Sequence, residues 1–143
     1  MQTKEQHKLK FLGVSIVNVQ LEVFNQSEDE QNVDLYVDAK LFPREVGSKS
    51  FRIWMNVEMK VQDFWEIKIA GFGDFEFGEN TDEENQKHLI NVNAPAIIFP
   101  YFRSFISTLT ANCGGTVPVS IIPPHFFSGE LESLVISEEE SAE

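Results

Sequence analysis

The sequence has few of the residues on which disulfide, metal and nucleic-acid chemistry depend. Its 143 residues include one cysteine, Cys113, and three histidines. A single thiol cannot close an internal disulfide, and the histidines have no partner at metal-ligand spacing, so we expect neither a metal nor a cofactor. Lys and Arg number 11 against 23 Asp and Glu, a net charge of −12. This excess of acid argues against nucleic acid as a partner, because Lys and Arg neutralise phosphates.

Long apolar runs are also missing. The longest, residues 94–102, contains two prolines and falls short of the roughly 20 residues that cross a bilayer. The polar N-terminus has no apolar run of the kind found in signal peptides. We therefore expect a cytoplasmic protein without a membrane span.

The length and the hydrophobic content of 42% predict one globular domain over residues 1–143. Its N-terminus, residues 1–9, and its acidic tail, residues 137–143, are expected to be flexible. Acidic clusters occur at residues 28–30, 79–84 and 138–143. Each cluster is either a solvated loop or tail, or part of an acidic surface that docks a basic partner.

Alternating apolar and polar residues, which predict half-buried strands, dominate the first half of the chain. The alternation covers residues 10–24, 33–42, 51–61 and 64–77. A change of phase near Ile16 predicts a β-bulge. Gln62 and Asp63 separate the last two segments, which we expect to form a hairpin. No helical crossover separates the strands, so the pattern predicts a four-stranded antiparallel sheet with one covered face. Glycines in the last strand, Gly71 and Gly73, indicate a bulge or a close approach by another backbone.

The cover of this sheet is predicted at residues 94–113, where apolar residues recur at helical spacing over one broad face. Asn93 and Pro95 are expected to begin the helix, and Gly114-Gly115 to end it. Pro100 predicts a kink or a restart, because proline removes a hydrogen bond from a helix interior. The remaining helix face carries small residues that either face solvent or let a second copy approach: Ser104, Ser107, Thr108 and Ala111.

The C-terminal part is expected to be extended through residues 116–124 and then to form a short amphipathic helix that includes Phe126, Phe127, Leu131, Leu134 and Val135. The predicted fold class is therefore α+β, with one long helix and one short C-terminal helix on the sheet.

No catalytic arrangement is recognisable. Cys113 has no histidine near it in sequence and lies on an apolar helix row, which is typical of a buried, inert thiol. Gly71-Phe72-Gly73 lies within a strand pattern and is followed by acids that would repel phosphate. We expect no enzyme.

Aromatic side chains occupy strand positions where the alternation predicts exposure. They are Tyr36, Phe42, Trp54, Phe64 and Phe72, interleaved with acids. These residues either pack in an oligomer or as cross-strand pairs, or they form a binding surface of aromatic patches in an acidic field.

One segment suggests a family. Residues 93–107 read Asn-Ala-Pro-Ala-Ile-Ile-Phe-Pro-Tyr-Phe-Arg-Ser-Phe-Ile-Ser, and Gly114-Gly115-Thr116, Val117-Pro118 and Pro123 or Pro124 with Phe126 follow. Together with four alternating strands upstream, this order resembles the SecB export chaperones over about residues 10–134. The resemblance implies a homotetramer built as a dimer of dimers. SecB proteins hold secretory precursors unfolded and pass them to the translocase ATPase SecA. The chain also resembles uncharacterised SecB-like proteins of Gram-positive bacteria, which have no established export role.

The resemblance also implies roles for particular residues. Glu22, Phe64 and Glu66 match the SecA-docking positions of the family, whereas Asn18 stands where the family usually has an acid. In a chaperone, a groove lined by aromatic residues would bury apolar client segments; the candidates are Phe72, Phe75, Phe99 and Phe126.

The expected function is binding of unfolded or precursor polypeptides by a self-associated dimer or tetramer, with SecA as a further partner. The alternative is a SecB-fold interaction or regulatory protein with one dedicated partner, such as a toxin-linked antitoxin or a cell-envelope assembly factor. A broad chaperone should bind several unrelated unfolded chains, whereas an adaptor should bind one protein.

Overall fold

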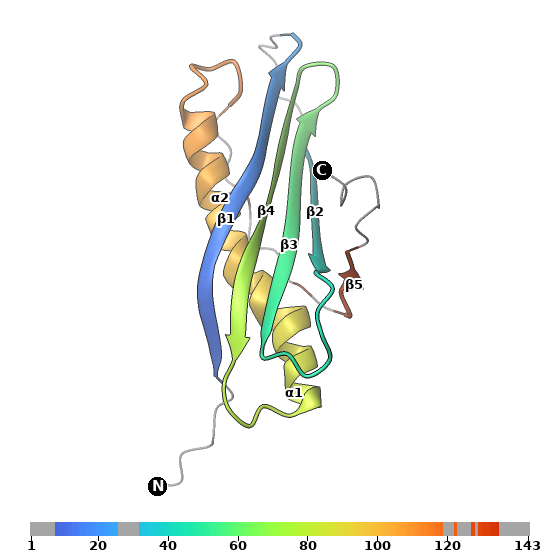
Figure 1. The fold of residues 1–143 in the computed structure, drawn as a ribbon. Helices are drawn as coiled ribbons and strands as arrows, with labels where there is room; N and C mark the ends of the chain where they lie inside the picture. Colours follow the sequence, from blue (N-terminus) through green and yellow to red (C-terminus); the bar gives the residue numbers. More distant parts are fainter. Residues whose placement is uncertain (1–7, 26–31, 119–121, 123–126, 128, 135–143) are drawn as a thin grey trace, which may run out of the picture.

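A computed structural model of the chain describes residues 8–25, 32–118, 122, 127 and 129–134. The expected flexible N-terminus and acidic tail lie largely outside these residues, as does Phe126. The fold is α+β, and one long helix covers one face of a sheet (Figure 1). The strands are β1 (Leu9–Val23), β2 (Asp34–Leu41), β3 (Ser50–Val61), β4 (Trp65–Phe77) and β5 (Glu132–Ser133). The helical elements are α1 (Glu83–His88), the π-helical turn η1 (Leu89–Asn93) and α2 (Ala94–Ala111).

The sheet has five strands in the order β1-β4-β3-β2-β5, rather than the four expected. The four long strands are antiparallel, as predicted, but β5 pairs parallel to β2 through Lys40 with Glu132 and Leu41 with Ser133. The Leu134 N–H also donates to the Leu41 carbonyl at 2.8 Å. The predicted C-terminal helix is absent from described residues 127 and 129–134. The edge of β2 offers unpaired backbone groups there, and pairing with them replaces the local helical preference.

The predicted hairpin of β3 and β4 is confirmed, with a turn at residues 62–64 and Asp63 at φ 71°. β1 pairs with β4 and carries two irregularities, between Phe11 and Gly13 and between Ile16 and Asn18. The second is the bulge predicted from the phase change, whereas the first was not predicted.

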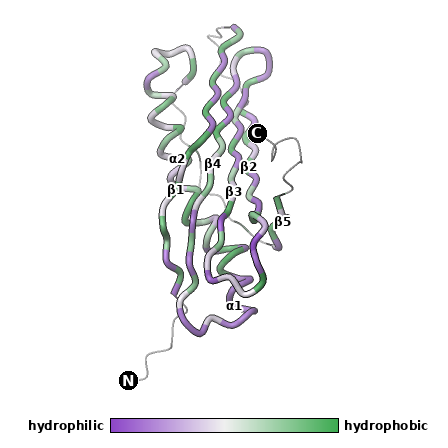
Figure 2. The backbone as a smooth tube through the Cα atoms, viewed as in Figure 1, coloured by the Kyte–Doolittle hydropathy of each residue, from purple (hydrophilic) through white to green (hydrophobic). Residues whose placement is uncertain are grey.

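The core lies between the sheet and α2. Alternate residues of β3 and β4 are buried, including Ile53, Met55, Ile67 and Phe75, and the alternation of hydropathy along these strands is visible in Figure 2. From α2, Ile98, Phe102 and Ile106 are fully buried against this face. The sheet therefore has an inner face under α2 and an outer face turned away from it.

The helical region begins earlier than predicted. The Asp82 side chain accepts the Asn85 N–H at 2.8 Å and caps α1, and Glu83 and Glu84 occupy its first turn, where acidic side chains complement the helix dipole. The prediction that Asn93 caps the helix is wrong, because Asn93 already has helical backbone angles and makes no capping bond. α2 runs unbroken through Pro100, so the expected restart does not occur. α2 ends at Ala111 with Asn112 as its C-cap, and Gly114 and Gly115, which were predicted to end it, follow in the next turn at φ 60° and 89°.

The C-terminal segment is tied to the helical layer. Val117 and Ile122 are buried, and the Arg103 side chain donates from Nε to the Ile122 carbonyl at 2.9 Å. The Leu131 N–H donates to Asn91 Oδ1 at 2.8 Å. In the described part of the chain, no helix combines the length and the apolar character needed to span a bilayer.

Candidate interaction surfaces

The outer face of the sheet carries an acidic region near the β3–β4 turn. Glu22 of β1 lies directly across from Glu66 of β4, and Lys60 of β3 lies on the other side of Glu66. Two carboxylates in facing positions repel each other, and Lys68 offsets this with an ion pair to Glu66 at 2.9 Å. The hydrogen bond and the negative charge of Glu66 raise the pKa of the Lys68 ammonium.

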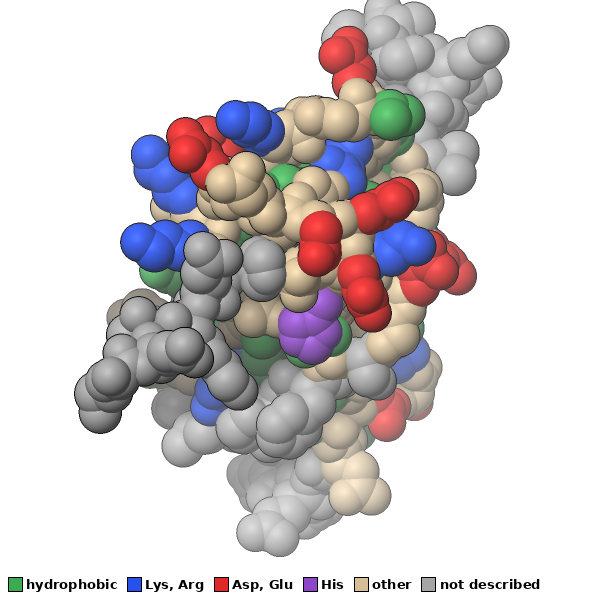
Figure 3. All heavy atoms as spheres, turned by 90° about the horizontal axis from the view of Figure 1, so that it is seen from below, with side chains coloured by type: hydrophobic (Ala, Val, Ile, Leu, Met, Phe, Trp, Pro, Cys, Tyr) green, Lys and Arg blue, Asp and Glu red, His purple; other side chains and the backbone are tan. Residues whose placement is uncertain are grey.

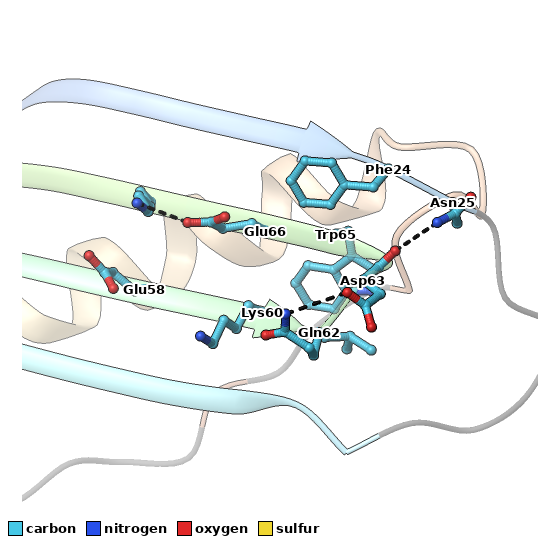
Figure 4. Close-up of a pocket in the computed structure, with 10 residues that line it drawn as sticks. Phe24, Asn25, Glu58, Lys60, Gln62, Asp63, Trp65 and Glu66 are labelled. Atoms are coloured by element: carbon cyan, nitrogen blue, oxygen red, sulfur yellow. Dashed lines mark hydrogen bonds and ion pairs between the residues drawn. The ribbon is translucent and has the colours of Figure 1, made fainter.

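A hollow of about 680 Å³ opens beside these charges (Figure 4). Its lining includes Phe24, Lys60, Asp63, Trp65 and Glu66. The Asn25 amide donates to the Asp63 carbonyl at 2.9 Å and ties the end of β1 to the β3–β4 turn. This hollow is therefore built on a fixed backbone corner.

The three predicted SecA-docking residues differ in their placement. Glu22 and Glu66 lie together on the outer face, as their strand positions predict. Phe64 lies in the turn, is half-buried and packs against the core, and its carbonyl accepts the Phe24 N–H at 2.7 Å. The structure thus brings the two acids together and leaves only part of Phe64 accessible.

A second feature of the outer face is a cluster of aromatic and charged side chains, which we call the arginine–aromatic cluster. It consists of Phe42, Arg52, Trp54, Phe72 and Asp74. The Arg52 guanidinium lies 3.9 Å from the Phe72 ring centre, and it donates two hydrogen bonds to Asp74 at 2.6 and 3.1 Å. Phe42 packs edge-on against Trp54 and Phe72. Of the alternatives for the exposed aromatics, cross-strand pairing describes this cluster.

The sequence did not single out Arg52 and Asp74. Residues at equal distances from a hairpin turn face each other, and this rule pairs Arg52 with Asp74 and Trp54 with Phe72. The signal for the cluster was therefore present once the turn at residues 62–64 was assigned.

The predicted client-binding residues do not meet in one groove. Phe72 lies on the outer face, in the arginine–aromatic cluster. Phe75 is fully buried and Phe99 is 2% exposed, both on the side of the sheet covered by α2. Phe126 lies outside the described residues. A client would reach Phe75 only if α2 moved away from the sheet, and the Phe99 ring, on α2 itself, packs edge-on against Phe127 with ring centres 6.1 Å apart.

Exposed apolar side chains instead gather at the two edges of the sheet. Large apolar residues that the described structure leaves exposed are Leu12, Val17, Val19, Val23, Phe24, Val33, Leu35, Tyr36, Val46 and Tyr101. All except Val46 and Tyr101 belong to β1, β2 or residues adjoining them. Among the described residues, β1 has no partner on its outer edge, and β2 pairs with β5 only at Lys40 and Leu41.

The exposed side of α2 continues the surface of β1. The Tyr101 ring lies 5.4 Å from that of Phe11 on β1, and Tyr101 is 50% exposed. Ser104, Thr108 and Ala111 follow on the same helix face and are exposed, whereas Ser107 is half-buried. β1 and α2 thus form one continuous surface, with a strand edge that no described residue pairs with and a stripe of small side chains.

No described part of the chain gathers three or more metal-ligating side chains. Cys113 is half-buried, and its thiol donates to the Leu109 carbonyl at 3.2 Å.

At the end of the molecule that carries α1, basic and acidic side chains are mixed (Figure 3). The surfaces with a defined geometry are therefore the outer face and the two sheet edges.

Comparison with known proteins agrees with the sequence resemblance. An uncharacterized protein of Methanocaldococcus jannaschii is 32% identical over 77 residues, 54% of this chain and 48% of that protein. The protein-export protein SecB of Anaplasma phagocytophilum is 37% identical over 49 residues, 34% of this chain and 31% of that protein. The chain thus aligns with half or less of the length of these relatives.

A similar solved structure is a SecB-like chaperone of Mycobacterium tuberculosis in complex with a peptide from the HigA1 antitoxin. It has a TM-score of 0.67 at 14% identity and covers 82% of this chain and 87% of its own. At this identity the likeness shows the fold alone. The family model described as preprotein translocase subunit SecB matches residues 6–128. The chain therefore belongs to the SecB family.

Proposed function

We propose that this SecB-family protein binds non-native polypeptides and prevents them from folding or aggregating. Family membership supports a chaperone role in general terms. The structural observation that carries the proposal is the concentration of exposed apolar side chains along two strand edges whose backbone groups have no partner strand among the described residues over most of their length. Such edges are templates for pairing with another extended chain. No chemical step is involved in this function.

The open edge of β2 is the proposed client surface. No described residue pairs with this edge from Asp34 to Ala39, and Val33, Leu35 and Tyr36 lie exposed beside it. An unfolded client supplies backbone donors and acceptors as well as apolar side chains, whose burial contributes roughly 25 cal/mol per Å². Because neither contribution depends on a particular sequence, this surface would accept many clients. The net charge of −12 would also attract basic segments.

The surface of β1 and α2 is the proposed contact with a second copy. It combines the longest strand of the sheet with the stripe of small residues that follows Tyr101 on α2. Pairing of two β1 edges would satisfy backbone groups on both chains and bury Val19 and Val23. The proposed working form in the cytoplasm is thus either a dimer or a tetramer built as a dimer of dimers. In both forms the β2 edges stay open to clients.

The function is tested by diluting a chemically unfolded, slowly folding substrate into buffer with the purified protein and following light scattering. We expect suppression at stoichiometric excess and at least a fivefold loss of client affinity in Tyr36→Glu, which puts a charge beside the β2 edge. Val46→Glu is the matched control, because Val46 is fully exposed in the β2–β3 loop. Unchanged aggregation with the wild-type protein would contradict holdase activity, and equal effects of both variants would contradict the site.

A second candidate is a chaperone dedicated to one partner. The antitoxin peptide bound by the Mycobacterium tuberculosis chaperone favours this alternative. Affinities for several unrelated unfolded chains separate the two: similar values support a broad chaperone, whereas binding of one chain alone supports a dedicated one.

Transfer of clients to SecA is a further part of the proposal, with Glu22, Glu66 and the accessible part of Phe64 as the docking site. We expect E22Q/E66Q to weaken binding of purified SecA at least tenfold in titration calorimetry. The control, Glu76→Gln, lies at the opposite end of the outer face, where it pairs with Lys10 and Ser50. Failure of the wild-type protein to bind SecA, or equal binding by E22Q/E66Q, would contradict this docking role.

A further inference from the structure

A hollow of about 410 Å³ lies next to the arginine–aromatic cluster. Its lining combines apolar side chains with two arginines and includes Leu12, Phe42, Pro43, Arg44, Arg52 and Asp74. Leu12 is 50% exposed. The hollow therefore offers an apolar wall beside two guanidinium groups, of which that of Arg52 is paired with Asp74, so that the lining keeps one excess positive charge on a chain whose net charge is −12.

The two arginines are held in place but can bind another anion. Arg52 is fixed by Asp74 and by the ring of Phe72, and Arg44 donates from Nη1 to the Ser48 carbonyl at 2.9 Å and lies 5.5 Å from the Phe77 ring centre. A guanidinium has five N–H donors, which is more than the bonds to Asp74 or to the Ser48 carbonyl use, so each arginine keeps donors for a further anion. A ligand carboxylate would gain charge-assisted hydrogen bonds without the cost of ordering these side chains.

The chain itself supplies a segment with matching chemistry. Residues 135–143, outside the described part, read Val-Ile-Ser-Glu-Glu-Glu-Ser-Ala-Glu, an apolar pair followed by acids. The segment starts after Leu134, whose N–H donates to the carbonyl of Leu41 at 2.8 Å. Leu41 directly precedes Phe42 and Pro43, which line the hollow.

The distances permit contact. Arg52 lies on β3, two strand spacings from β5, or about 10 Å, whereas residues 135–143 span up to about 30 Å when extended. A tether this short gives an effective concentration on the order of 1 mM. Even a weak intrinsic affinity therefore suffices for occupancy.

We propose that the hollow beside the arginine–aromatic cluster binds an extended acidic peptide segment, and that residues 135–143 of the same chain are its resident ligand. Val135 and Ile136 cover the apolar wall, and the acids beginning at Glu138 face Arg52 and Arg44. The site lies on the outer face, apart from the stretch of the β2 edge, Asp34 to Ala39, that is proposed as the client surface. A partner with the same order of apolar and acidic residues would have to displace the resident segment.

The test uses the two tryptophan indole N–H resonances of the full chain. Trp54 belongs to the cluster, whereas Trp65 is 4% exposed in the core and serves as an internal reference. In E138Q/E139Q/E140Q, we expect the Trp54 resonance to shift while that of Trp65 stays fixed. Addition of a synthetic peptide of residues 135–143 should reverse the shift, with an apparent affinity at least tenfold higher than for the wild-type chain, whose own segment competes.

An Arg52→Gln background completes the test. In that background E138Q/E139Q/E140Q should no longer move the Trp54 resonance, because the arginine that the acids bind is absent. An identical Trp54 resonance in the wild-type and triple-substituted chains would overturn the proposal. A shift that persists unchanged in the Arg52→Gln background would also overturn it, because the acids would then act elsewhere.

Discussion

Replacing Gly71 with alanine is expected to lower the free energy of unfolding by about 3 kcal/mol, the upper part of the range for overpacked cores. A Cβ atom at this position would overlap the carbonyl oxygen of Ser15 and lie 2.9 Å from the Ile16 Cα. Both atoms belong to the backbone of β1, so no side-chain rotation can relieve the clash. β1 would have to move away from β4 along the ladder that joins them. Urea denaturation followed by circular dichroism measures the change.

Gly73→Ala is the matched comparison for this prediction. Its added Cβ would meet the end of the Ile98 side chain, with Cγ1 and Cδ1 at 2.7 Å. An isoleucine side chain can shift where a strand backbone cannot, so we expect a smaller cost of about 1 kcal/mol. When Gly73→Ala is made in an Ile98→Val background, where the Cδ1 atom is missing, the cost of the added Cβ should be smaller still. A loss in Gly73→Ala as large as that in Gly71→Ala would contradict the role assigned to the β1 backbone.

Val19→Glu is expected to raise the dissociation constant of self-association at least 100-fold. Val19 lies on β1, is 44% exposed and would be buried if two β1 edges paired. A carboxylate there would lose its hydration in the interface, and chains that each carry −12 offer it little compensation. Sedimentation velocity should show a multiple of the 16.3 kDa chain mass for the wild-type protein and a shift towards the monomer for the variant.

Val46→Glu is the control, because it adds the same charge to an exposed valine far from β1 in the sequence. Its sedimentation should match that of the wild-type protein. A wild-type chain that remains a monomer at high concentration would refute the proposed β1–α2 contact, as would equal dissociation by both glutamate variants.

Much of the sheet could be predicted because alternation and turn chemistry are local. The segments around Gln62 and Asp63 determine both the hairpin and its register, and that register places Arg52 opposite Asp74. The bulge near Ile16 was visible because it reverses the parity of the apolar residues that follow. The close backbone approach was visible at Gly71, where only a missing side chain permits it.

The missed elements depend on contacts between distant segments. β5 exists because residues 132 and 133 meet the edge of β2, and nothing in their own sequence distinguishes them from a short helix or a loop. The early start of the helical region depends on the Asp82 cap, which lies in an acidic stretch that also fits a solvated loop.

The candidate surfaces show the same division. Glu22 and Glu66 could be placed on one face from strand parity, whereas the client assignment of Phe75 followed its aromatic character rather than its parity. Phe75 stands at an inward position of β4 under α2, where an aromatic side chain fills the core. The edge residues that remain exposed could not be identified from sequence, because the order of strands in the sheet is not a local property.

The shortness of β5 has a consequence for the client surface. Among the described residues, two residue pairs and the hydrogen bond from Leu134 to Leu41 join it to β2, and a ladder of this length is among the first parts of a sheet to fray. Each opening event would uncover the last rungs of the eight-residue strand β2. Each such opening would lengthen the free edge of β2 that is proposed as the client surface.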